Sequence, residues 1–125
     1  EIQNTKTRTT VRGGQFDLED RTMRFARKAM DYCKRLPKNM THFEISKQLI
    51  RSAGSVGANY IEANEALSKK DFVLRVKICR KEVKESRYWL NLTEPNEELL
   101  NIREELTREA TELMKIFGAI IEKSK

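Results

Sequence analysis

Hydrophobic residues recur at intervals of three and four from about residue 16 almost to the C-terminus. This period predicts a succession of amphipathic α-helices. Four such stretches are expected, the first from about Asp17 to Leu36, where Pro37 stops the helix. The residues on the predicted apolar faces are, in chain order, Leu18, Thr22, Phe25, Ala29, Tyr32 and Leu36; Ile45, Leu49, Ala53, Val56, Tyr60, Ala63 and Leu67; Phe72, Val76, Cys79, Val83, Ser86 and Leu90; and Leu99, Ile102, Leu106, Ala110, Leu113, Phe117 and Ile120.

Polar residues that cap helices separate these stretches. Thr41 and Glu44 have the spacing of a capping box, Ser68 is expected to cap the third helix, and Asn96 is expected to cap the fourth. Short connections make successive helices antiparallel. The chain is therefore predicted to be an all-α, up-down-up-down antiparallel four-helix bundle over residues 16–125, preceded by a disordered basic tail over residues 1–15.

The composition agrees with a single helical domain and offers little catalytic chemistry. The chain has 125 residues with a formal net charge of +6, and no apolar run approaches the roughly 18 residues that a membrane span needs. Cys33 and Cys79 lie in separate apolar patterns, which favours buried reduced thiols in a cytoplasmic protein. His42 is the only histidine, and the sequence lacks paired metal ligands. We expect no enzymatic activity, cofactor, metal or membrane association.

The third stretch has a basic face in addition to its core face. At 100° per residue, Lys70, Lys77, Arg80, Lys81 and Lys84 lie together, with Lys69 and Arg87 at the margin. Such a face could contact nucleic-acid phosphates, remain solvated, or meet an acidic surface. The residues expected to bind nucleic acid are Lys70, Lys77, Arg80, Lys81, Lys84 and Arg87.

A second apolar strip on the same stretch contains Leu74, Ile78 and Trp89. It either packs inside a wide bundle core or forms a contact between subunits. We expect these three residues at an oligomer interface, with core packing as the alternative.

Two glycines weaken the second stretch. Gly54 and Gly57 within four residues cost a helix on the order of 2 kcal/mol relative to alanine. Together with Ala58 they leave no side-chain bulk, so we expect close packing of a neighbouring backbone at this segment. A phosphate-binding glycine loop is rejected, because no Gly-Lys-Ser/Thr follows and no strand precedes.

These residues also carry a family resemblance. Ser52, Ser55-Val-Gly-Ala-Asn59, Glu62-Ala63, Tyr88-Trp-Leu90 and the ending Leu113–Ile121 resemble the proteins encoded in intervening sequences of bacterial 23S ribosomal RNA genes. The resemblance covers residues 16 to 123, and Lys81-Glu82 replace the Gly-Ser of another branch. It implies a homopentamer of four-helix bundles without demonstrated catalysis. It also implies kinship with the accessory protein of diversity-generating retroelements, a basic pentamer that engages a reverse transcriptase and nucleic acid.

Two functions are therefore expected from the sequence. The first is a non-enzymatic oligomer that binds RNA or DNA backbone through the basic face, associated with rRNA or accessory to a reverse transcriptase. The alternative is a protein-interaction module that does not bind nucleic acid.

Overall fold

A computed structural model describes the backbone of residues 14–125 and the side chains from Leu18 onward. It contains α1 (Gly14–Arg35), α2 (Met40–Asn64), α3 (Lys69–Leu92), a short 3₁₀ turn (Glu97–Leu99) and α4 (Leu100–Lys123). The predicted tail over residues 1–15 lies outside the described residues except for residues 14 and 15. These two belong to the first turn of α1, so this helix begins before the expected Asp17.

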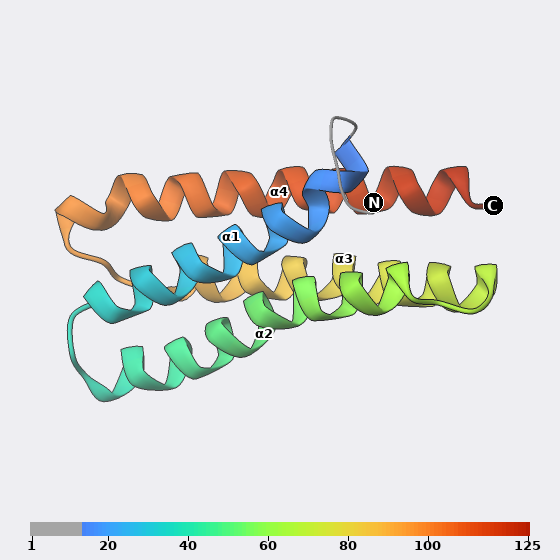
Figure 1. Cartoon of the computed structure of the whole chain (residues 1–125). Helices are drawn as coiled ribbons and strands as arrows, with labels where there is room; N and C mark the ends of the chain where they lie inside the picture. Colours follow the sequence, from blue (N-terminus) through green and yellow to red (C-terminus); the bar gives the residue numbers. More distant parts are fainter. Residues whose placement is uncertain (1–13) are drawn as a thin grey trace.

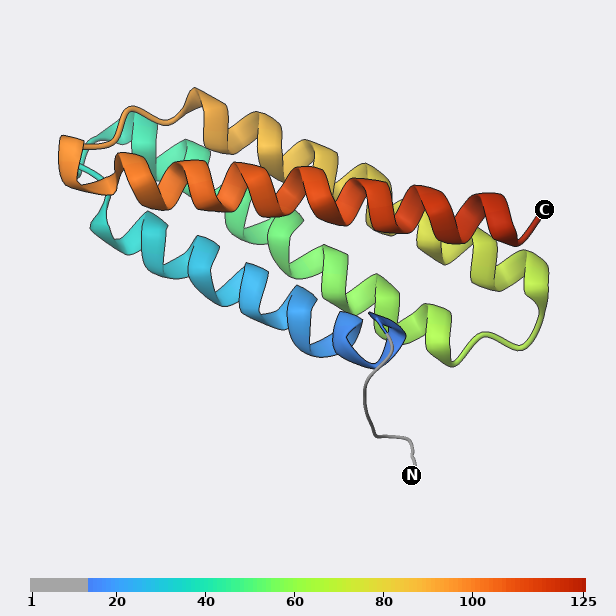
Figure 2. The same cartoon turned by 90° about the horizontal axis from the view of Figure 1, so that it is seen from above.

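The four helices run alternately up and down (Figure 1). The connections α1–α2 and α3–α4 lie at one end of the bundle, and the connection α2–α3 lies at the other. Viewed from above, the first turns of α3 and the last turns of α4 extend beyond the beginning of α1 (Figure 2). The predicted four-helix bundle is confirmed.

The core lies along the predicted apolar faces. Large side chains such as Phe25, Leu49, Leu90 and Phe117 are almost fully buried. Leu67 was predicted to be in the core, but it is 97% exposed because α2 ends at Asn64. Near the end of α4, Ile121 is buried, and the predicted Ile120 packs only partly against the core.

Helix caps agree with the sequence at one of three positions. Ser68 caps α3, and its hydroxyl accepts a hydrogen bond from the Asp71 amide. The capping box predicted at Thr41 is wrong, because Asn39 caps α2 and accepts from the His42 amide at 2.8 Å. The side chain of Asn96 makes no capping hydrogen bond, since the chain passes through the 3₁₀ turn before α4.

Buried polar contacts join the two connections at one end of the bundle. His42 is buried, its Nδ1 lies 2.9 Å from the Pro37 carbonyl oxygen, and its Nε2 accepts from the Glu94 amide at 3.0 Å. Nearby, the Tyr32 hydroxyl lies 2.6 Å from that of Thr93. These contacts satisfy polar groups that burial would otherwise destabilise, and they account for the single histidine without assigning it catalysis.

Candidate nucleic-acid interface

Packing of α3 against the core determines which way its lysines face. Val76, Cys79 and Val83 are fully buried on the inner side of the helix. The opposite side is therefore solvent-exposed along the length of α3. Among its exposed residues are four lysines, which we call the lysine row: Lys70, Lys77, Lys81 and Lys84.

The lysine row has no direct ion pair among residues 18–125. No described residue forms an ion pair with any of these four lysines within 4.0 Å. Cations on α1 behave differently, because Lys28 and Lys34 each lie within that distance of a carboxylate. The row is thus a strip of positive charge that an external anion can reach.

The acidic residues in the second half of α3 pair with a cation of α2. Arg51 of α2 contacts Glu82 at 3.3 Å and Glu85 at 2.7 Å. A hydrogen bond from the Trp89 indole, a hydrogen bond and charge from Arg51, and the charge of Lys81 keep the pKa of Glu85 below its usual value. Arg51 therefore offsets part of the negative charge that would otherwise reduce the potential along the lysine row, and Lys81 is the member of the row whose charge reaches Glu85.

The two arginines predicted to bind nucleic acid lie toward α4. Arg87 is half-buried, and its guanidinium donates to the Thr111 hydroxyl at 3.0 Å. Arg80 is exposed and passes beside Gly118, where an added Cβ would lie 3.9 Å from its Nη1. Arg80 can therefore extend the lysine row, while Arg87 is partly occupied within the chain.

A groove continues the basic surface at the far end of the bundle. It has a volume of about 620 Å³ and lies between the first turns of α3 and the last turns of α4. Its wall is mostly apolar, with Val73, Leu74 and Ile121 among the lining residues, and Lys69, Lys70, Lys77, Lys125 and Asp71 also line it. The lysines at its edge extend the positive charge of the lysine row toward the end of α4.

The same sequence can be compared with known proteins. Residues 15–119 match the family of 23S rRNA-intervening sequence proteins. The chain belongs to this family. A crystal structure of a protein of unknown function from the S23 ribosomal protein family of Bacteroides thetaiotaomicron is 32% identical, with a TM-score of 0.71. The alignment covers 83% of this chain and 97% of that protein. Among curated proteins, none matches the sequence.

In this 23S rRNA-intervening sequence protein, the segment with Gly54, Gly57 and Ala58 packs closely against another helix only at Gly57, as far as the described residues show. A Cβ at Gly57 would lie 3.0 Å from the Thr22 hydroxyl of α1, so a larger residue here would require the Thr22 side chain to move by a few tenths of an ångström. Nothing lies within 4 Å of a Cβ at Gly54, and Ala58 is exposed. Close packing within the chain therefore explains Gly57 but not Gly54 or Ala58.

The three residues predicted at an oligomer interface, Leu74, Ile78 and Trp89, differ in their exposure to solvent. Leu74 is 54% exposed, whereas Ile78 and Trp89 are half-buried. The Trp89 ring packs against the core, and its indole donates to Glu85 at 3.0 Å. Intrachain packing thus accounts for much of Trp89, and Leu74 remains available for contact with another chain.

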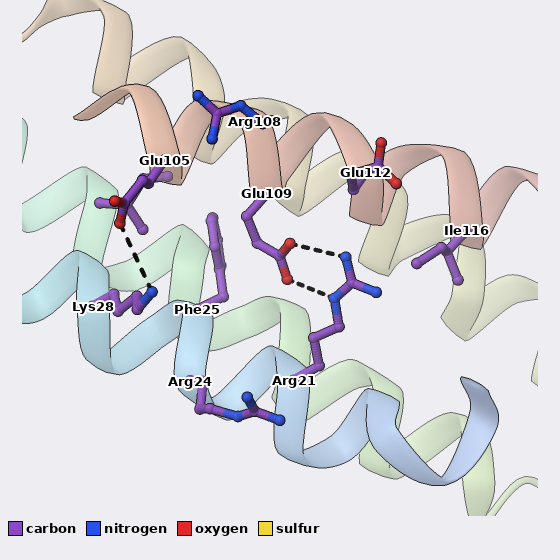
Figure 3. A pocket seen from close by; sticks show the side chains of 10 residues that line it. Arg21, Arg24, Phe25, Lys28, Glu105, Arg108, Glu109, Glu112 and Ile116 are labelled. Carbon is purple, nitrogen blue, oxygen red and sulfur yellow. Dashed lines mark hydrogen bonds and ion pairs between the residues drawn. The ribbon is translucent and has the colours of Figure 1, made fainter. Parts of the chain in front are cut away.

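A second groove, of about 830 Å³, separates α1 from α4 (Figure 3). Arg21 of α1 donates to both carboxylate oxygens of Glu109 at 2.6 and 2.9 Å, and Lys28 faces Glu105 at 4.0 Å. The carboxylates that face α1 are thus paired with its cations. We interpret this groove as a polar seam between two helices.

Side chains and helices of the described part of the chain bear on metal binding, thiol reactivity and membrane insertion. Within residues 18–125, no three histidine, cysteine or acidic side chains are grouped so that they could hold a metal ion. Burial raises the pKa of both thiols, that of Cys79 to about 12, so neither is an activated nucleophile. Among the described helices, none is both long and apolar enough to cross a membrane.

Proposed function

We propose that this protein is a non-enzymatic, self-associating bundle that binds the phosphate backbone of RNA or DNA through the lysine row. The observation that carries the proposal is a strip of exposed lysines on α3 without ion-pair partners among the described residues. The carboxylates of Glu82 and Glu85 on the same helix are bonded to Arg51 instead. This arrangement favours an anionic ligand.

The chemistry of lysine determines what kind of binding to expect. An ammonium group is a point charge that neutralises phosphate and releases counterions, but it reads little sequence. A straight α3 places Lys77 and Lys84 about 10 Å apart along its axis, at 1.5 Å per residue. Several phosphates of one strand can therefore be contacted together.

Self-association would strengthen this weak contact. If several copies present their lysine rows on one assembly, contacts to one nucleic acid become intramolecular after the first, and avidity rises. We propose a homopentamer, the assembly that the family resemblance implies. That resemblance also makes ribosomal RNA or a reverse transcriptase with its template a candidate partner.

Replacing Lys77, Arg80 and Lys84 together by glutamine tests the basic surface. Affinity for a fluorescent oligonucleotide should fall, and the dependence of log affinity on log salt should flatten by about 0.7 per lost single-strand contact. The matched control replaces three exposed cations of α1 and α2, Arg27, Lys34 and Lys47, with the same change in net charge. This control should keep most of the affinity.

The outcomes separate two functions. If the α3 variant binds like the parent, the lysine row is not the binding site. If the parent binds no RNA or DNA even at low salt, the nucleic-acid function is wrong and the protein-interaction module takes its place.

A further inference from the structure

An exposed aromatic ring lies in line with the lysine row. Tyr88 follows Lys81 by seven residues, about two helical turns, and therefore lies on the same face of α3. Its side chain is 58% exposed. The other two tyrosines are buried: Tyr32 lies beside the Thr93 hydroxyl, and Tyr60 packs against Phe117. Tyr88 makes no hydrogen bond to any described residue, so its hydroxyl has no polar partner among residues 18–125.

The chain nevertheless restricts the position of the Tyr88 ring. The ring meets Trp89 edge to face, with centroids 5.1 Å apart and planes at 77°. Trp89 is in turn held by the core and by its hydrogen bond to Glu85, which Arg51 also contacts. The Tyr88 ring is thus supported on one side and open on the other.

The Tyr88 ring, held by Trp89, lies beside the lysine row, whose members form no ion pair with any described residue. This combination is typical of surfaces that bind single-stranded nucleic acid. Proteins that bind single strands combine a basic track for the backbone with aromatic rings on which bases stack. In a duplex, the bases are already stacked on one another and expose only their edges. A side chain on a helix surface can therefore stack on a base only where that base is unpaired.

We propose that Tyr88 stacks on an unpaired base while the lysine row contacts the adjoining phosphates, so that the ligand is single-stranded RNA or DNA. Lys84 lies one turn before Tyr88 and Lys81 two turns before it, which suits a strand running along α3. This inference rests on the proposed function, and it specifies that the bound nucleic acid is single-stranded.

The test compares one labelled oligonucleotide as a single strand and as a duplex, at one salt concentration. Tyr88→Ala should weaken binding of the single strand by about 5-fold to 150-fold, the range for loss of one base–aromatic stack. Duplex binding should change less than about twofold, because the phosphate contacts are unaltered. Tyr88→Phe keeps the ring and should bind within about twofold of the parent.

Two further measurements sharpen the result. Phe43→Ala is the matched control, because Phe43 is 63% exposed and lies beside Lys47 but belongs to α2. It should bind like the parent. Trp89 is the only tryptophan and touches Tyr88, so a stacked base should quench its emission in the parent. Circular dichroism should confirm that each variant is folded.

Other results would overturn the inference in distinguishable ways. If Tyr88→Ala binds the single strand as tightly as the parent, or loses single strand and duplex equally, stacking at Tyr88 is wrong. The proposed function then stands, provided that the glutamine variant of Lys77, Arg80 and Lys84 weakens binding. If the parent binds neither form, both proposals fail.

Discussion

Cys79 shows how burial controls the chemistry of one side chain. It lies on the inner side of α3, is fully buried, and its thiol donates to the Val56 carbonyl oxygen at 3.4 Å. Desolvation raises its pKa to about 12, because the charge of Arg75 only partly offsets the hydration that a thiolate would lose. The thiol therefore stays protonated in the folded protein at neutral pH and serves as a small apolar group.

This pKa shift predicts a loss of stability at alkaline pH. In the folded protein, the pKa of the Cys79 thiol exceeds its usual value of 9.0. Above about pH 9 only the unfolded chain releases this proton, which favours unfolding. Between pH 8 and 10 the parent should lose about 1.4 kcal/mol more free energy of unfolding than Cys79→Ala. Urea denaturation at each pH measures this difference. Equal losses would mean that Cys79 ionises normally when folded.

At the scale of the helix, Gly54 and Gly57 of α2 have different surroundings. Gly57 faces Thr22, whose buried hydroxyl donates to the Leu18 carbonyl oxygen at 2.7 Å and cannot easily move. Gly54 faces open space. Both glycines weaken the helix, but only Gly57 has a reason within the chain.

Alanine at each position should therefore have opposite effects. Gly54→Ala should stabilise the subunit by about 1 kcal/mol, because alanine favours the helix and its methyl group meets nothing. Gly57→Ala should destabilise it by about 1–3 kcal/mol, because the methyl group would lie 3.0 Å from the Thr22 hydroxyl. Thermal unfolding of the two variants measures both effects. The same sign for both would contradict this account.

The helices and their core faces could be predicted because local periodicity determines them. The exposed lysine row also followed, since a helix with one apolar face directs its opposite side to solvent. The ends of the elements were less predictable: Thr41 competed with Asn39 as the cap of α2, and Leu67 continued the apolar pattern past the end of the helix. Such competition depends on backbone geometry that periodicity does not describe.

Two features of the site depend on contacts that a linear pattern does not contain. Arg51 reaches Glu85 from another helix, 34 residues earlier, so its effect on the charge of α3 was not foreseen. Tyr88 was recognised only as part of a family motif. Tyr88 lies 18 residues, about five helical turns, after Lys70, and this spacing alone would have placed it on the same face of the helix as the lysines. Whether its ring is exposed, however, depends on the packing of Trp89.

At the scale of the whole molecule, charge is divided between α3 and the end of the chain. Residues 68–93 carry eight basic and three acidic side chains, a net +5, and residues 94–125 carry five and eight, a net −3. Within the chain, Glu109 and Glu105 of α4 pair with Arg21 and Lys28 of α1, and Arg87 of α3 donates to the Thr111 hydroxyl. The four lysines of the lysine row have no such partner among the described residues, so they can contact an acidic surface of another copy as well as a nucleic acid.

Self-association is the last prediction. Light scattering should give about 74 kDa for a pentamer of 14.7 kDa chains. Leu74→Asp should reduce this mass while leaving the helical signal intact, since Leu74 is 54% exposed and its loss opens no core cavity. Met40→Asp, at an 80% exposed position outside α3, is the control and should leave the mass unchanged.

Trp89→Asp should instead destabilise the subunit, because Trp89 packs against the core. A parent that is monomeric at micromolar concentration would contradict the assembly, and avidity could then not strengthen binding to the lysine row.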